Sequence, residues 1–290
     1  MLDDMTDHMI GNPILLNRII RRALEEDIGH GDLTTDAILG EGTEGRALLL
    51  AKEGLILAGL PVFCRAFELL SPEMRFEPFF EDGHFIPKGE KICLVSGPIP
   101  VILKAERTAL NFLQRMSGIA TLTRKYMDKV GSKEVRVVDT RKTAPGLRLL
   151  DKYAVRMGGG CNHRFGLFDG VLIKDNHIAA AGSITRAVDL VRKRAPHTIK
   201  IEVEVEDLTG LEEAIQAGAD VILLDNMTPD MMRQAVDVNR GRVLLEASGN
   251  VTLENIAQIA QTGVDIISSG ALTHSPRAVD LSLKLLTECL

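Results

Sequence analysis

The sequence predicts an α/β protein in which a smaller α+β domain precedes a domain of parallel strand–helix units. Two observations support this prediction. From about residue 135 onward, short apolar strands alternate with helical stretches, which is the pattern of parallel βα units. Before that point, the chain of 290 residues mixes one long helical stretch with strands that turns interrupt. We expect the first domain to cover residues 1–117 and the second to cover residues 118–276.

The first domain is expected to begin with a helix. Asn12 can cap a helix and Pro13 is tolerated at its first position, and apolar residues then recur at helical spacing to about Glu26. The next segment, EDIGHGDLTTD, is rich in Gly, Asp and Thr and is predicted to be an ordered loop. The elements expected after it are two short strands (45–59), a helix (60–70) and further strands broken by turns (75–97).

A long helix is predicted to follow Pro98. Its buried stripe is Ile102, Ala105, Ala109, Leu113 and Met116. Arg107 falls on a different face of this helix. We expect Ser117-Gly118 to interrupt it and a second helix to continue to about Val130. A final helix within residues 277–290 is expected to pack on the first domain.

The second domain contains about six apolar strands separated by helical stretches. The predicted strands are 135–139, 170–174, 201–205, 220–225, 242–247 and 264–269. Their apolar character is typical of strands covered on both faces. Units of this kind most simply close, or nearly close, into a βα barrel, and fewer than eight strands favour an incomplete one. An open doubly wound sheet is the alternative, although no GxGxxG motif follows the first strand.

Composition excludes several functional classes. The formal net charge of −6 and the absence of Trp argue against a nucleic-acid-binding protein. No apolar run approaches the roughly 20 residues of a membrane helix, and the N-terminal MLDDMTDHMIG lacks the features of a signal peptide. The four cysteines (Cys64, Cys93, Cys161 and Cys289) form no CxxC pair, so we expect no disulfide framework, no zinc site and a cytoplasmic location.

Polar residues stand at the end of every predicted barrel strand. In a βα barrel the active site forms at the carboxyl ends of the strands. Charged groups in apolar strands cost several kcal/mol unless they are paired or bound, so six polar ends indicate a binding site. These ends are 139–142, 174–177, Glu202 with Glu204, 225–226, 246–250 and 268–271.

Cations dominate the first two strand ends. Arg141, Arg164 and the more distant Arg107 can each bind a carboxylate or phosphate in bidentate fashion. Lys142 and Lys174 are point charges for the same kind of ligand, and His163 in the CNHR motif is a candidate contact or a structural residue. Cys161 has cationic neighbours but no identifiable base, so we do not expect a nucleophile there.

The later strand ends carry groups suited to phosphate and ribose. The loops of Ser248, Gly249 and Asn250 and of Ser269, Gly270 and Ala271 offer backbone N–H groups, the first just before a helix expected to begin near Thr252. Carboxylates at Glu204 and Asp225 suit ribose hydroxyls or a magnesium ion carried by a phosphate ligand; alternatively, they neutralise neighbouring Lys and Arg. Together the groups describe a phosphoribosyl donor that meets an acidic acceptor.

Several of these motifs are similar to those of one enzyme family. DTRKTAPGLRLLDKYAV, GGGCNHRFGL and LIKDNH together resemble quinolinate phosphoribosyltransferases, which are decarboxylating nicotinate-nucleotide pyrophosphorylases. The resemblance covers nearly the whole chain. EEDIGHGDLTT, AERTALNFLQRMSGIAT, EVEVE, LLDN, ASGNVT and SSGALTHS also match in order.

The resemblance implies both a reaction and an architecture. Quinolinate and phosphoribosyl pyrophosphate would give nicotinate mononucleotide, pyrophosphate and CO2, for the synthesis of NAD. The resemblance also implies Mg²⁺ without an organic cofactor, an N-terminal α/β sandwich and an incomplete βα barrel. It further implies a homodimer, or a higher oligomer, in which Arg107 reaches the partner's active site.

The resemblance also assigns roles to individual residues. Arg141, His163, Arg164 and Lys174 are similar to the quinolinate-binding cations, with Lys142 and Thr140 in the same site. Glu204 and Asp225 resemble the residues that bind the ribose and the metal ion. The resemblance implies that they hold the metal indirectly, through the pyrophosphate of the donor. The catalytic residues implied are Lys142, Lys174, Glu204 and Asp225. The loops 248–250 and 269–271 resemble phosphate-binding loops.

Three alternatives remain open from the sequence. The first is a phosphoribosyltransferase of the same fold with another acceptor, like the relatives associated with molybdenum transport. The second is an aldolase that forms a Schiff base on Lys174 or Lys142, although two phosphate loops and three arginines would then have no use. The third is a phosphosugar-binding module without catalytic activity.

Overall fold

The computed structural model describes residues 10, 12–39, 42–131 and 134–286. Cys289, the end of the expected C-terminal helix and most of the N-terminal segment lie outside them. The chain forms two compact units. The first contains the residues up to 124, residues 144–159 and those from 275, and the second contains residues 125–143 and 160–274. The predicted boundary after residue 117 falls within helix α5 (Ile99–Val130), which contributes to both units.

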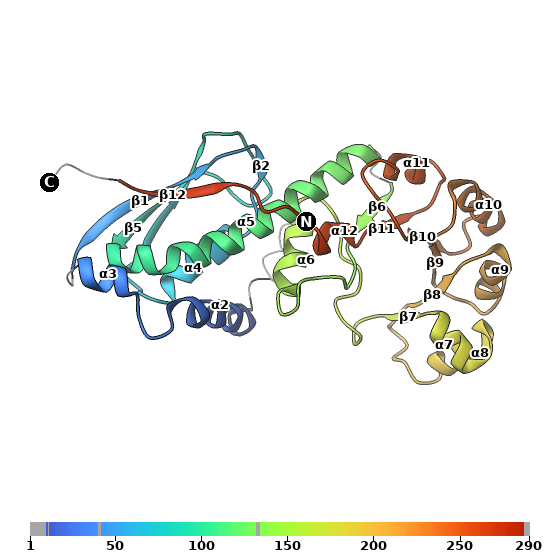
Figure 1. The fold of residues 1–290 in the computed structure, drawn as a ribbon. Helices are drawn as coiled ribbons and strands as arrows, with labels where there is room; N and C mark the ends of the chain where they lie inside the picture. Colours follow the sequence, from blue (N-terminus) through green and yellow to red (C-terminus); the bar gives the residue numbers. More distant parts are fainter. Residues whose placement is uncertain (1–9, 11, 40–41, 132–133, 287–290) are drawn as a thin grey trace. The chain divides into compact units, whose positions relative to one another are not determined.

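The first unit contains an antiparallel sheet of four strands (Figure 1). Its strands, in spatial order, are β12 (Leu281–Leu286), β1 (Glu44–Ala51), β5 (Lys91–Pro98) and β3 (Arg75–Pro78). A separate pair joins β2 (Leu55–Ile56) to β4 (Phe85–Ile86). The strands predicted within 45–59 and 75–97 are therefore confirmed.

Residues 281–286 form a strand, so the helix predicted within residues 277–290 is wrong for this described part. β12 pairs with β1 along Leu281–Leu286. Leu281 and Leu283 are buried and Lys284 is exposed, and this segment is rich in leucine. The sheet thus uses the side-chain alternation of a strand, which the apolar composition alone did not distinguish from a helix.

Two helices begin with side-chain caps, as their sequences require. In α2 (Pro13–Ile28), Asn12 Oδ1 accepts hydrogen bonds from the N–H groups of Ile14 and Leu15, which confirms the predicted start. The loop predicted for EDIGHGDLTTD is wrong for most of that segment, which contains the end of α2 and the start of α3 (Leu33–Ile38), capped by Asp32. The helix predicted at 60–70 is α4 (Leu60–Glu68).

Helix α5 runs without a break, so the predicted interruption at Ser117-Gly118 is wrong. The two small residues serve close packing instead. Ser117 Oγ accepts from the Ala58 N–H at 3.0 Å and donates to the Ala58 carbonyl at 3.2 Å. A Cβ on Gly118 would lie 2.2 Å from the Arg277 carbonyl oxygen, so a side chain has no room there.

Helix α6 (Arg148–Met157) belongs to the first unit, although it follows the first barrel strand in sequence. Its Asp151 side chain is fully buried and accepts from Arg115 Nε at 2.9 Å and Nη2 at 2.8 Å. The Ala144 N–H donates to the same carboxylate at 3.0 Å. The Tyr153 hydroxyl donates to Asp82 Oδ2 at 2.7 Å. Polar contacts therefore fix this segment within the first unit.

The second unit is built on a parallel sheet of six strands in the order β6-β11-β10-β9-β8-β7. The first strand of the unit lies beside the last, and the others follow in sequence. This cyclic order is that of a barrel, whereas a doubly wound sheet reverses direction at a switch point. β6 and β7 form the two edges among the described residues, so the barrel is open, as predicted. The strands are β6 (Arg136–Val138), β7 (Val171–Ile173), β8 (Ile201–Val205), β9 (Val221–Asp225), β10 (Leu244–Ser248) and β11 (Ile266–Ser268).

Helices follow the barrel strands and ring the outside of the sheet in Figure 1. The helical stretches predicted between the strands are α6, described above, and α8 (Ile184–Arg192), α9 (Leu208–Gln216), α10 (Pro229–Asn239) and α11 (Ile256–Ala260). Two short helices, α7 (Asp175–Ala181) and α12 (Ala271–His274), begin directly at strand ends and were not predicted. None of the described helices combines the length and apolar character that a membrane span needs.

Candidate active site

A cavity of about 650 Å³ lies at the carboxyl ends of the strands of the second unit. All the predicted site residues from Thr140 to Asn250 line it. The complete lining is Thr140, Arg141, Lys142, His163, Arg164, Leu172, Lys174, Glu204, Leu223, Asp225, Asn226, Glu246, Ser248, Gly249, Asn250 and Ser268.

The remaining predicted residues lie elsewhere. Arg107 is exposed on the part of α5 that belongs to the first unit. Ser269 is buried, with its N–H bonded to the Val138 carbonyl and its hydroxyl to the Val251 carbonyl, so both groups are already used within the fold. A Cβ on Gly270 would lie 2.8 Å from Lys142 Cδ, so Gly270 makes room for the lysine. Ala271 begins α12.

The lining also includes residues that had no predicted role. Glu246 and Asn226 stood at predicted strand ends, and Glu246 shares a strand face with Ser248 because side chains alternate along a strand. That spacing is the signal that could have identified Glu246. Leu172 and Leu223 also line the cavity, and nothing in their local sequence distinguishes them from core leucines.

Asp139 fixes the position of the CNHR motif. Its side chain is fully buried at the end of β6. It accepts from Asn162 Nδ2 at 2.6 Å and from the His163 N–H at 3.0 Å. A buried carboxylate needs such donors, so the Asp of the DTRK motif is structural and holds His163 and Arg164 beside the first strand end.

The loop after β6 presents two exposed cations. The Lys142 N–H donates to Thr140 Oγ1 at 3.1 Å, and the Thr273 hydroxyl donates to the Lys142 carbonyl at 2.9 Å. The backbone is therefore held while the side chains of Arg141 and Lys142 remain exposed to solvent. Fixed cations with exposed ends are suited to an anionic ligand.

Arg164 adds a third positive charge that is partly buried. Its Nη1 donates to the Gly170 carbonyl at 2.9 Å. Burial and the neighbouring charge of Arg141 lower the pKa of Arg164, while Glu202 and Asp169 act in the opposite direction. An anion bound between Arg141 and Arg164 would relieve this repulsion.

Lys174 and Glu204 form an ion pair across neighbouring strands. Lys174 Nζ lies 2.5 Å from Glu204 Oε2. The Lys174 N–H donates to His177 Nδ1 at 3.0 Å, so the His of the LIKDNH motif holds the start of α7. Glu204 therefore has the neutralising role considered from the sequence, and it also lines the cavity.

The ends of β9 and β10 are joined by a network of amides. Asn226 Nδ2 donates to Asp225 Oδ2 at 2.8 Å, and Asn250 Nδ2 donates to Asn226 Oδ1 at 3.1 Å. Both asparagines have positive φ, 53° and 50°, a conformation that marks functional loops when the surroundings enforce it. Between them, a Cβ on Gly249 (φ 90°) would lie 2.3 Å from Asn226 Oδ1.

The helix after this loop begins later than predicted. α11 starts at Ile256, whereas the sequence placed a helix start near Thr252. The Asn255 side chain explains the delay: its Oδ1 accepts from the Thr252 N–H and its Nδ2 donates to the Asn250 carbonyl. The loop 248–250 is thus held by side-chain amides, and the expected helix N-terminus does not directly follow it.

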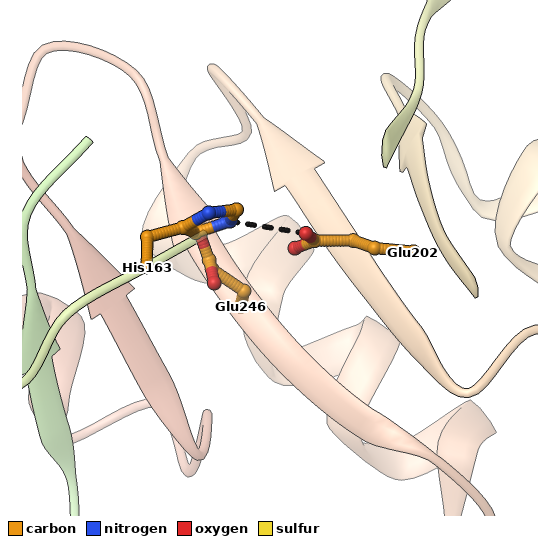
Figure 2. Close-up of side chains that lie close together, drawn as sticks. All are labelled: His163, Glu202 and Glu246. Carbon is orange, nitrogen blue, oxygen red and sulfur yellow. Dashed lines mark ion pairs between the residues drawn. The ribbon is translucent and has the colours of Figure 1, made fainter. Parts of the chain in front are cut away.

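His163, Glu202 and Glu246 form a cluster that sequence reasoning did not recognise (Figure 2). His163 Nε2 lies 3.0 Å from Glu202 Oε2 and 3.7 Å from Glu246 Oε1. Burial and the charge of Glu202 raise the pKa of Glu246 to about 7. One ligand-type atom from each of the three residues lies within 4.8 Å of the others, a spacing compatible with a metal ion.

The cavity therefore has two chemically different ends. Arg141, Lys142 and Arg164 supply positive charge beside the first strand. Glu204, Asp225 and the amide loop supply acceptors and donors at the later strands. A ligand with several anionic groups at one end and hydroxyl or phosphate groups at the other matches this distribution.

Family models match both parts of the chain. Residues 119–284 match the model described as "Quinolinate phosphoribosyl transferase, C-terminal domain". Residues 32–117 match the corresponding "N-terminal domain" model.

Individual relatives are similar over most of their length. A probable nicotinate-nucleotide pyrophosphorylase [carboxylating] of Bacillus subtilis is 45% identical over 94% of each chain. A chloroplastic nicotinate-nucleotide pyrophosphorylase [carboxylating] of Arabidopsis thaliana is 46% identical over 94% of this chain and 83% of the relative. The solved structure of the nicotinate-nucleotide pyrophosphorylase from Francisella tularensis has 41% identity and a TM-score of 0.90, over 94% of this chain and 96% of that one.

Proposed function

The chain belongs to the quinolinate phosphoribosyltransferase family, and from this premise we propose that it converts quinolinate and phosphoribosyl pyrophosphate to nicotinate mononucleotide, pyrophosphate and CO2. It is thus a phosphoribosyltransferase of NAD biosynthesis. The observation that carries the proposal is that one cavity has cations at one end and carboxylates and amides at the other.

Quinolinate binds at the cationic end in this proposal. The ring carries two adjacent carboxylates, and each needs positive charge when it leaves water. Arg141 and Arg164 provide guanidinium groups, and Lys142 provides a point charge beside them. Thr140 and His163 complete the same wall of the cavity. Several fixed cations orient the flat ring, and orientation is itself a source of catalysis.

The phosphoribosyl donor binds at the later strands. Glu204 and Asp225 suit the ribose hydroxyls, and the loop 248–250 offers donors to phosphate oxygens. Gly270 and Ala271 of the second predicted phosphate loop lie outside the cavity lining, and Gly270 packs against Lys142 at the cationic end. Lys174 and Glu204 form an ion pair within the cavity lining, so a donor that contacts Lys174 would compete with Glu204 for its positive charge.

The residues at the donor end also fit a magnesium ion. Mg²⁺ prefers oxygen ligands and is usually bound by one or two carboxylates together with substrate phosphates. Glu204 and Asp225 line the cavity and offer such oxygens. They would hold the ion indirectly, through the donor. An ion held there would supply positive charge to neutralise the departing pyrophosphate.

The transfer step requires positioning more than a nucleophilic side chain. As pyrophosphate leaves, positive charge develops at ribose C1, and carboxylates of Glu204 and Asp225 stabilise it electrostatically. Lys142 and Lys174 stabilise the anionic groups. The ring nitrogen of quinolinate then forms the bond to C1. The resulting pyridinium accepts the electron pair left when the adjacent carboxylate departs as CO2.

Turnover of labelled quinolinate tests this function. With quinolinate labelled at the 2-carboxylate, phosphoribosyl pyrophosphate and Mg²⁺, we expect one labelled CO2 for each nicotinate mononucleotide formed. Nicotinate offered in place of quinolinate should give no product. Absence of labelled CO2 would refute the assignment, and turnover of another pyridine acceptor alone would identify a relative with a different specificity.

We further propose a homodimer in which Arg107 enters the active site of the partner subunit. Arg107 lies one turn after Lys104, which pairs with Asp36 of α3 at 2.6 Å. The same short helix exposes Leu33 (91%) and Ile38 (73%). Exposed large apolar side chains and an exposed arginine in the same unit are suited to a subunit interface.

Mixing inactive variants tests the sharing of the site. Arg107→Ala and Asp225→Ala homodimers should each be nearly inactive. Subunits mixed by unfolding and refolding should recover up to about a quarter of the wild-type activity per site, since a mixed dimer contains one intact site. Mixing two preparations of Arg107→Ala provides the control. Failure of the mixture to recover activity while size measurements show mixed dimers would exclude a shared site.

The proposed location is the cytoplasm. This proposal is supported by the sequence, which has four widely spaced cysteines and no CxxC pair. The free thiols of Cys64, Cys93 and Cys161 are compatible with a reducing compartment.

A further inference from the structure

The proposed reaction consumes a proton at a carbon atom. When the bond between ring carbon C2 and its carboxylate breaks, the electron pair stays on C2 next to the pyridinium nitrogen, and CO2 leaves. A new C2–H bond must then form. The cations that hold quinolinate stabilise anions, but an acid is needed to supply this proton.

We propose that Glu246 is this acid: its carboxyl group protonates C2, and His163 and Glu202 position it. This inference rests on the proposed function. The O–H bond of Glu246 breaks, the C2 electron pair takes the proton, and the glutamate is left as a carboxylate. Water then restores the proton between turnovers.

The location of Glu246 supports this role. It lies on β10, two residues before Ser248, and lines the cavity together with the cations. Its side chain is 3% exposed, and its Oε1 has no hydrogen-bond partner in the part of the chain that the structure describes. Nearly complete burial of an unsatisfied carboxyl oxygen costs free energy, so its retention at a cavity wall requires an explanation.

The imidazole of His163 presents a single ring N–H to both Glu202 and Glu246. The Arg164 N–H donates to His163 Nδ1 at 2.8 Å, so Nδ1 carries no proton. The ring proton is therefore on Nε2, which faces Glu202 at 3.0 Å and Glu246 at 3.7 Å (Figure 2). One N–H thus faces two carboxyl groups, and it fully compensates only one negative charge.

The second carboxyl group is consequently favoured in its protonated form. Two negative charges this close, away from water, repel strongly. Burial and Glu202 raise the pKa of Glu246 to about 7, near the value that suits a general acid at neutral pH. The titratable and charged groups that act on it directly are Glu202 from β8 and His163 from the segment before β7; Arg164 acts on Glu202.

The same geometry argues against a metal ion in this cluster. A metal bound to His163 Nε2 requires a lone pair there, which places the ring proton on Nδ1. Nδ1 already accepts from the Arg164 N–H, so the ring would have to turn over and lose that bond. The cluster is therefore arranged to handle a proton.

Single-turnover measurements with Glu246→Gln test the proposal. Enzyme in excess, with labelled quinolinate and phosphoribosyl pyrophosphate, allows pyrophosphate and CO2 to be followed separately. We expect pyrophosphate to form within about threefold of the wild-type rate. Formation of nicotinate mononucleotide should slow by about 10²-fold or more, the usual contribution of a general acid. CO2 adds back to a C2 carbanion that is not protonated, so quinolinate mononucleotide, the intermediate that still carries both carboxylates, should accumulate.

Glu206→Gln serves as the matched control, since Glu206 is exposed just after β8 and does not line the cavity. It should behave as wild type. Glu246→Asp, which keeps an acid, should retain more of the protonation step than Glu246→Gln. Equal slowing of pyrophosphate and nucleotide formation in Glu246→Gln, or no slowing of either, would overturn the inference. Failure of the wild type to turn over would instead refute the proposed function.

The pH dependence provides a second readout. The acid form of Glu246 is present below its raised pKa and is lost above it. The rate of nucleotide formation in a single turnover should therefore fall as pH rises through about 7, while pyrophosphate formation should not follow this profile. Glu202→Gln removes the neighbouring charge, so the fall should move to lower pH. An unchanged profile in Glu202→Gln would contradict the positioning role.

Discussion

Replacement of Arg164 by alanine is expected to raise the KM for quinolinate by about 10- to 100-fold, with a much smaller effect on the KM for phosphoribosyl pyrophosphate. A hydrogen bond to a charged group contributes about 1.5–3 kcal/mol, and each 1.4 kcal/mol is a factor of about ten. Arg164 is partly buried beside Arg141. A quinolinate carboxylate bound to it is therefore less accessible to water than an anion bound to a surface arginine. Steady-state kinetics with each substrate varied in turn measures the effect.

Two further variants make the Arg164 experiment specific. Arg164→Lys keeps the charge but loses the planar fork, so it should lie between the wild type and Arg164→Ala. Arg186→Ala, an exposed residue of α8 in the same unit, should leave both KM values unchanged. Because Arg164 also donates to the Gly170 carbonyl, thermal unfolding should accompany the kinetics. A rise in the KM for phosphoribosyl pyrophosphate alone would reverse the assignment of the two ends of the cavity.

Replacement of Asp151 by alanine is expected to lower the free energy of unfolding by about 3–5 kcal/mol, the usual cost of removing one partner of a buried ion pair. Asp151 is fully buried and accepts two hydrogen bonds from Arg115. Without it, two hydrogen bonds from the Arg115 guanidinium and one from the Ala144 N–H are lost. Urea unfolding followed by circular dichroism measures the change.

A surface ion pair provides the control for Asp151. Asp230 pairs with Arg233 at 2.5 Å across one turn of α10, but its side chain is 86% exposed. Exposed pairs contribute about 0–1 kcal/mol, so Asp230→Ala should change the free energy of unfolding very little. If the two variants unfold at the same urea concentration, burial does not decide the strength of these pairs in this protein.

The sequence predicted the barrel and most of its cavity because both follow local rules. Apolar strands of the second unit stand out from their polar neighbours, and the carboxyl ends of parallel strands meet at one edge. Thr140, Lys174, Glu204 and Asp225 needed only this rule to be brought together. The family resemblance then supplied roles that composition leaves open.

The predictions of secondary structure that were wrong concern segments where tertiary contacts outweigh the local sequence pattern. The apolar segment 281–286 became a strand because β1 offers it a paired edge. Ser117-Gly118 became part of α5 because Ala58 and Arg277 pack closely against it. The sequence places Glu246 at a strand end. Its proximity to His163, which comes from a distant segment, is seen only in the structure. Such long-range partners have no signature in a single sequence.

The location of α6 limits how this chain can be divided. The backbone passes between the two units after residues 124, 143, 159 and 274. Dividing the chain after residue 117 therefore separates the two regions that the family models match, but it does not separate the two compact units. A fragment starting at residue 118 would carry Asp151 and Tyr153 without Arg115 and Asp82, their hydrogen-bond partners. A chimera that joins the N-terminal half of one homologue to the barrel of another must therefore keep both hydrogen-bonded pairs. The two halves of the chain are thus expected to evolve together.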